Sequence, residues 1–83
     1  MALLRYFSWV REKIGVASES IPLPAEVDTV AALQAFLATR SSAHAELLNH
    51  PNLRIAVNQR YARPNDPVAD RDEIALFPPV SGG

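Results

Sequence analysis

The sequence has 83 residues, enough for one small domain. It has no cysteine, which excludes disulfides, iron–sulfur clusters, thiolate zinc sites and a cysteine nucleophile. Eight basic and nine acidic residues give a net charge of −1, so no basic excess is present for binding a nucleic-acid backbone. The longest apolar runs have only a few residues, against roughly 20 for a membrane span, so we expect a cytoplasmic protein without membrane contact.

The first predicted elements are a strand, a short helix and a second strand. Residues 2–7 alternate as a strand does, and Ser8 is a predicted N-cap for a helix over 9–14 that Gly15 ends. Residues 18–23 are predicted to form an edge strand, because its two nearby prolines cannot donate ladder hydrogen bonds. One face of the first strand carries Leu4 and Tyr6, and the other carries Leu3, Arg5 and Phe7.

The main helix is predicted over residues 30–39, after Asp28 or Thr29 as its cap. Its apolar stripe recurs at i, i+3 and i+7, widened by one aromatic residue. The stripe consists of Val30, Leu33, Leu37 and Phe36. A second, shorter helix is predicted over 41–49, ending near a proline.

The last part of the chain is predicted to form three strands joined by turns. Strands are expected over 53–58, 60–62 and 73–77, with Asn58-Gln59 turning the first into the second. Loops are expected over 64–67 and 70–72. The residues predicted to face inward are Leu53, Ile55, Val57, Ile74 and Leu76.

This order of elements predicts an α+β fold of the β-grasp, or ubiquitin-like, type. One main helix packs on one face of a mixed sheet of about five strands. The first and last strands are the most apolar, so we expect them at the centre. The domain is expected to cover 1–77, followed by an extended tail over 78–83.

Residues that could form a self-contained active site are few. His44 and His50 have no carboxylates at ligand spacing, so we expect solvated surface histidines and no metal site. Asp70, Asp72 and Glu73 are read as a solvated turn. The sequence has no glycine-rich phosphate loop and no motif that would activate a serine.

The end of the sequence is its most unusual feature. Two prolines favour an extended exit from the last strand, and two glycines can pass through a narrow channel. A glycine carboxylate is also unshielded, which suits a group that another protein activates and attacks. The alternative is an ordinary frayed terminus. The segment reads Pro78-Pro79-Val80-Ser81-Gly82-Gly83.

A possible docking surface lies beside this tail. If Ile74 and Leu76 face the helix, alternation turns Phe77 to the opposite face, as it does Phe7. Two aromatic residues on an outer face indicate a surface for a partner protein, whereas two stray surface aromatics are the alternative. Arg11 or Arg5 is a candidate for a carboxylate-pairing charge at its rim, with plain solvation as the alternative.

Segments along essentially the whole chain resemble one family, the MoaD family of molybdopterin synthase small subunits. The most specific segment is the ending Phe77-Pro78-Pro79-Val80-Ser81-Gly82-Gly83. The other segments are Tyr6-Phe7, Val10-Arg11-Glu12, Gly15, Thr29-Val30, Leu33, Ala56-Val57-Asn58-Gln59, Asp70, Asp72-Glu73 and Ile74-Ala75.

The resemblance implies a sulfur carrier that is not an enzyme by itself and binds no cofactor. A MoeB-like partner would use ATP to adenylate the Gly83 carboxylate, and a sulfur donor protein would supply the sulfur for a thiocarboxylate. The tail would then enter a MoaE-like large subunit, which holds the catalytic residues and passes sulfur to the pterin precursor for the dithiolene. The implied assembly is a heterotetramer of two small and two large subunits.

One residue departs from the family pattern, and three other functions stay open. The family usually has Asp-Gly-Asp before the last strand, whereas this chain has Arg71 in the middle position, where a positive φ would be strained. The alternatives are a sulfur carrier for thiamin or cysteine synthesis and a protein modifier joined through Gly83 to lysines. A non-covalent binding module with an incidental tail is a further alternative.

Overall fold

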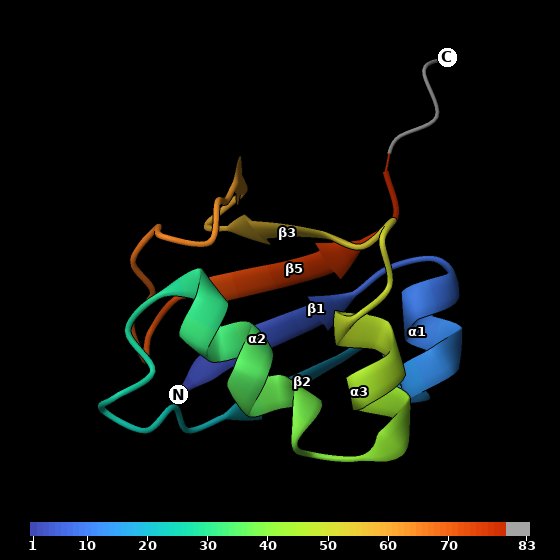
Figure 1. Ribbon diagram of the computed structural model, residues 1–83, viewed down its shortest axis with the longest axis horizontal. Coiled ribbons are helices and arrows are strands. Elements are labelled where there is room, and N and C mark those ends of the chain that lie inside the picture. Colours follow the sequence, from blue (N-terminus) through green and yellow to red (C-terminus); the bar gives the residue numbers. More distant parts are fainter. Residues whose placement is uncertain (80–83) are drawn as a thin grey trace.

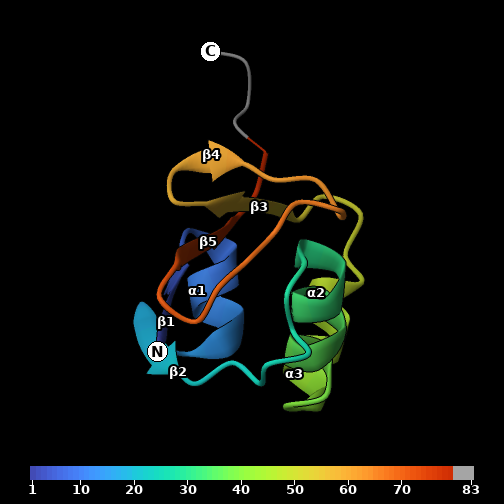
Figure 2. The ribbon, with the colours of Figure 1, turned by 90° about the vertical axis from the view of Figure 1, so that its left-hand side faces the viewer.

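The computed structural model describes residues 1–79 as a five-stranded sheet with three helices on one side of it (Figures 1 and 2). The order of elements matches the predicted one. None of the helices in this part of the chain is long and apolar enough to cross a membrane. The elements are β1 (Ala2–Tyr6), α1 (Trp9–Ile14), β2 (Ser18–Ile21), α2 (Val30–Ala38), α3 (Ser42–Leu48), β3 (Arg54–Val57), β4 (Arg60–Tyr61) and β5 (Glu73–Phe77).

The sheet has the order β2-β1-β5-β3-β4, which confirms that the first and last strands are central and that β2 is an edge strand. β1 and β5 run parallel, and every other neighbouring pair is antiparallel. Because β1 and β5 are parallel, the residues that follow them leave the sheet at the same end. Figure 1 shows α1 and residues 78–79, which follow β5, at that end.

The core lies between the sheet and the helices. Leu4 and Tyr6 of β1 are buried beside Ile74 and Leu76 of β5, as the alternation predicts. The helix stripe is confirmed as well, since three of its four residues are buried and Phe36 packs against them half-buried. Those three are Val30, Leu33 and Leu37. Leu47 of α3 completes the layer.

Two of the three helices begin with a side-chain cap. The Thr29 hydroxyl accepts a hydrogen bond from the Ala32 N–H (3.2 Å), so Thr29 rather than Asp28 caps α2. Ser41 caps α3 in the same manner. Ser8 stands at the predicted cap of α1, but its side chain makes no cap bond. It has φ 59° and ψ −135°, the conformation that a type II′ turn places at its first central residue and that favours glycine.

The β3–β4 connection is the predicted two-residue turn. Asn58 and Gln59 have φ values of 51° and 68°, the pair of positive values that a type I′ hairpin requires. The Asn58 side chain also ties the hairpin to β5. It donates to an Asp72 carboxylate oxygen (3.1 Å) and accepts from the Glu73 N–H (3.0 Å).

The structure adds three details to the predicted fold. Arg71 is not among the non-glycine residues with positive φ, so the turn before β5 departs from the left-handed conformation that the family pattern implies. Leu53 and Val57 pack against the core as predicted but are only half-buried, whereas Ile55 is buried. Ala56 is buried on the opposite face, where Tyr61 lies directly across the ladder from this small side chain.

Candidate docking face at the end of the central strands

The sheet face that carries no helix is an open surface with both apolar and charged residues. We call it the outer face. On β1 the outer face has Leu3 and Arg5, which pair in register with Glu73 and Ala75 of β5. On the other side of β5 it continues through Arg54 and Ala56 of β3 to Tyr61 of β4. No helix of residues 1–79 covers this face, so it is open to a partner protein.

Three aromatic residues gather at the end of the outer face where β5 stops. The Tyr61 and Phe77 rings lie with their centroids 5.7 Å apart. Phe7 follows β1 directly, and its N–H donates to the carbonyl of Leu76 (3.2 Å), which brings it level with Phe77. Tyr61 is 70% exposed and Phe7 41% exposed, while Phe77 is half-buried. The predicted pair of aromatic residues is thus a cluster of three.

Arg5 is the arginine that borders this aromatic cluster. Its guanidinium carbon lies 5.4 Å from the centroid of the Phe7 ring, a cation–π distance. The same guanidinium donates to a Glu73 carboxylate oxygen at 3.0 Å. Arg11 is exposed on α1 and forms no side-chain hydrogen bond or ion pair with residues 1–79. The structure therefore supports Arg5 as the rim charge and leaves Arg11 a prediction.

The tail begins beside this cluster. Pro78 and Pro79 follow Phe77 outside any strand, with Pro79 exposed. The predicted tail residues Val80, Ser81 and Gly82 and the predicted reactive terminus Gly83 lie outside the described residues. A protein that covers the aromatic cluster would therefore contact the chain just where the tail starts.

A polar cluster under the sheet holds β1 and β2 against the helices. The buried Tyr6 hydroxyl donates to a Glu19 carboxylate oxygen at 2.6 Å, and Arg40 donates to the other oxygen at 3.1 Å. Burial and the bond to Glu19 raise the pKa of Tyr6. Burial acts to raise the pKa of Glu19 too, but the bonds from Arg40 and Tyr6 outweigh it and lower that pKa. Tyr6 is therefore a structural donor, held protonated.

The two histidines differ from the sequence reading and from each other. His50 is exposed as predicted, with its ring 4.7 Å from that of Trp9. His44 is half-buried, and its Nε2 atom is buried without a hydrogen-bond partner. Burial, together with the nearby charge of Arg40, lowers the pKa of His44. His44 is thus a packed residue and not the solvated surface histidine expected.

The carboxylates of the turn before β5 accept hydrogen bonds from backbone N–H groups. Asp70 accepts from the Leu23 N–H (2.7 Å), which lowers its pKa, and Asp72 accepts from the Ala69 N–H (2.8 Å). No group of three potential metal-ligating side chains occurs within residues 1–79. These acidic residues stabilise the turn.

Tyr61 is the surface residue that the sequence reading missed. The signal for it was present, because a two-residue turn at Asn58-Gln59 fixes the register of the hairpin. That register pairs Ala56 with Tyr61, and Ala56 faces away from the inward Ile55. The register therefore predicts that Tyr61 shares the outer face with Phe77.

Comparisons with known proteins agree with this arrangement. The family model described as the ThiS family matches residues 4–83. The molybdopterin synthase sulfur carrier subunit of Escherichia coli is 37% identical over 83 residues, which is all of both chains. The protein of the same name in Haemophilus influenzae is 37% identical over 78 residues, or 94% of each chain.

Solved structures show the same fold. Molybdopterin converting factor subunit 1 of Pyrococcus furiosus superimposes with a TM-score of 0.79 and 30% identity, covering 95% of this chain and 97% of that one. Small archaeal modifier protein 1 of Haloferax volcanii gives 0.69 and 26%, with coverage of 95% and 97%. By sequence and by fold, the chain belongs to the ThiS family, in the group that includes the molybdopterin synthase sulfur carrier subunits.

Proposed function

We propose that this protein is the sulfur carrier subunit of a molybdopterin synthase, with Gly83 as its reactive terminus. The observation that carries the proposal is the exposed aromatic cluster beside the first residues of the tail. The 37% identity to the Escherichia coli carrier over all 83 residues supports it further. The fold supplies a docking surface, and the chemistry takes place at the end of the tail.

The proposed reaction divides the work between this chain and its partners. An adenylating enzyme joins the Gly83 carboxylate to the AMP part of ATP and releases pyrophosphate, because a free carboxylate is a poor electrophile and AMP is a good leaving group. A sulfur donor protein then provides sulfur, which displaces AMP and leaves a thiocarboxylate. The large subunit supplies the catalytic residues and receives the sulfur for the dithiolene. Within this proposal the carrier binds no cofactor and works in the cytoplasm, in an assembly of two small and two large subunits.

The reactive terminus is tested by loading it with sulfur. The protein is incubated with adenylating enzyme, ATP and sulfur donor, and its intact mass is measured. The wild type should gain the mass that replaces oxygen by sulfur. Deletion of Gly83, or one residue added after it, should abolish this gain while the melting curve stays the same. Equal loading of the extended variant would show that the terminus is not the reactive group.

The docking face is tested by the change Phe77→Ala. An aromatic anchor at the centre of an interface contributes about 2 kcal/mol, so we expect affinity for the large subunit to fall about 30-fold. Leu3→Ala is the matched control. Leu3 is also an exposed apolar residue of the outer face, but it pairs with Glu73 at the opposite end of β5. Equal binding by Phe77→Ala and the wild type would remove Phe77 from the interface.

A second candidate function is that of a protein modifier, favoured by the likeness to small archaeal modifier protein 1. A modifier would join Gly83 to lysine side chains of targets. Lys13 is the only lysine of the sequence, and its Nζ atom lies 2.6 Å from a Glu46 carboxylate oxygen. Lysine-linked chains of this protein would therefore require Lys13, and Lys13→Arg would abolish them. Isopeptide adducts on cellular proteins, without pterin product in the reconstituted assay, would decide for the modifier.

A further inference from the structure

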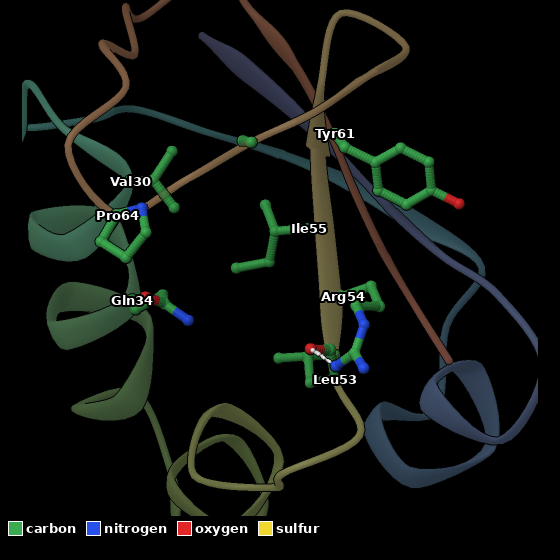
Figure 3. A pocket seen from close by; sticks show the side chains of 8 residues that line it. Val30, Gln34, Leu53, Arg54, Ile55, Tyr61 and Pro64 are labelled. Atoms are coloured by element: carbon green, nitrogen blue, oxygen red, sulfur yellow. Dashed lines mark hydrogen bonds between the residues drawn. The ribbon is translucent and has the colours of Figure 1, made fainter. Parts of the chain in front are cut away.

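A pocket of about 130 Å³ lies between α2 and the β3–β4 hairpin, on the helix side of the sheet (Figure 3). Most of its wall is apolar, and the Gln34 side chain points into it from α2. Val30 and Ile55 form its base and are themselves almost fully buried. The residues that line it include Val30, Gln34, Leu53, Ile55, Tyr61 and Pro64.

The size and lining of the pocket suit one aliphatic side chain. Apolar cavities of about 150 Å³ accept a molecule the size of benzene. A volume of about 130 Å³ therefore holds a leucine or isoleucine side chain from another protein. The side chain would contact Val30, Ile55 and Pro64, with the Gln34 amide at its side.

Arg54 lines this pocket, and two more arginines follow it closely in the sequence. Arg54, Arg60 and Arg63 lie within ten residues of one another on the hairpin and the segment that leaves it. In the described part of the chain, none of these three side chains forms an ion pair, whereas Arg5 and Arg40 both do. The Arg54 guanidinium donates only to main-chain carbonyls, of Pro51 and Leu53, so its charge is not neutralised. The protein as a whole has a net charge of −1, so this local excess is not a general property of the surface.

The pocket is continuous with the proposed docking face. Tyr61 lines the pocket and also lies against Phe77 on the outer face. It belongs to β4, the strand at the edge of the sheet, which has no neighbour on its other side. A partner that covers Phe77 can therefore pass over the β4 edge and reach the pocket without crossing a helix.

We propose that the large subunit has a second contact here, an acidic segment that crosses the β4 edge. One aliphatic side chain of that segment occupies the pocket, and its carboxylates pair with the guanidinium groups of Arg60 and Arg63. The proposal rests on the proposed function, because that function names the large subunit as the protein on the outer face. The charged contacts guide association, and the buried side chain fixes the orientation in which the tail is presented.

The test measures the affinity of the full-length protein for its large subunit by titration calorimetry, at 50 mM and 300 mM NaCl. Arg63→Glu should lower the affinity at least five-fold at the lower salt concentration, and less at the higher one. Arg71→Glu is the matched control. It makes the same change in net charge, at an exposed arginine of the turn before β5, and should change affinity less than two-fold.

The pocket is tested separately with a residue that fills it. Gln34→Phe should place a ring in the pocket and lower the affinity at least five-fold at both salt concentrations. Gln34→Ala, which leaves the pocket open, should have less than a two-fold effect. Circular dichroism and melting curves of all variants establish that they fold, and Arg63→Glu tests the proposal even if Gln34→Phe is unstable.

The outcomes separate this inference from the proposed function. If Phe77→Ala weakens binding but neither Arg63→Glu nor Gln34→Phe does, the second contact is refuted and the carrier function stands. If Arg63→Glu and Arg71→Glu have equal effects, only overall charge matters and the contact is refuted. If the two variants weaken binding to the adenylating enzyme alone, the assignment to the large subunit is wrong. If the wild type does not bind the large subunit, the proposed function fails first.

Discussion

The change Tyr6→Phe removes one hydroxyl from the polar cluster under the sheet and leaves the packed ring in place. The hydroxyl donates to a Glu19 carboxylate oxygen at 2.6 Å, and a hydrogen bond to a charged group contributes about 1.5–3 kcal/mol. Glu19 keeps its bond to Arg40, and its side chain is 24% exposed, so water can replace part of the loss. We therefore expect the free energy of unfolding to fall by about 1.5 kcal/mol and Tm by about 6–12 °C.

The same variant has a characteristic pH dependence. The pKa of Glu19 is lower in the folded chain, so its stabilisation is present above the unfolded value of about 4.5 and is lost as pH falls through the folded value. The pKa of Tyr6 is raised, so its stabilisation is present below about pH 10 and is lost as pH rises further. The stability difference between wild type and Tyr6→Phe should thus be largest between these limits and shrink on both sides.

The assay is urea unfolding, followed by circular dichroism at pH 3.5, 7 and 10.5. Tyr61→Phe is the matched control, because the Tyr61 side chain is 70% exposed and its hydroxyl forms no hydrogen bond with residues 1–79. It should change the free energy of unfolding by less than about 0.5 kcal/mol. If Tyr6→Phe is as stable as this control at pH 7, the bond to Glu19 does not stabilise the fold and the reasoning is refuted.

Three further changes test the local conformations described above. Ser8→Gly should raise the free energy of unfolding by about 0.5–1 kcal/mol, because Ser8 has φ 59° and glycine adopts it without strain; a lower Tm in a thermal scan would contradict this. Arg71→Gly should lower stability by about 0.5–1 kcal/mol, because φ is not positive there and glycine only adds freedom to the unfolded chain. A higher Tm for Arg71→Gly would indicate that the turn is left-handed after all. His44→Gln should flatten the loss of stability between pH 7 and pH 5 in urea unfolding. The pKa of His44 is lowered in the fold, beside Arg40 and Glu19, so the unfolded chain takes up the proton first as pH falls. Equal losses in both proteins would mean that His44 is not the responsible group.

The sequence predicted most of the fold because its patterns follow burial directly. The alternation of Leu4 and Tyr6, and of Ile74 and Leu76, is the alternation between a covered and an open sheet face. The spacing of the α2 stripe likewise reflects a helix with one covered side. These patterns also placed Phe7 and Phe77 on the outer face, since that position follows from which neighbours are buried.

What the sequence could not predict depends on residues far apart in the chain. His44 is half-buried where Arg40, which follows α2, and Glu19 of β2 come together beside it. No local sequence pattern predicts that contact. The φ values of Ser8 and Arg71 depend on how each turn connects its elements, and the family pattern at Arg71 suggested the wrong one. The pocket beside α2 requires three separate segments to converge.

The position of β5 has a consequence for how the protein is made. β5 lies between β1 and β3, so the first strand cannot complete its pairing until the last has been synthesised. A chain that ends before β5 lacks the middle of its sheet and leaves the facing edges of β1 and β3 without a hydrogen-bonded neighbour. Such a chain cannot form the aromatic cluster, which needs Phe77 itself. The docking surface of the proposed function therefore exists only in chains translated at least as far as the base of the tail.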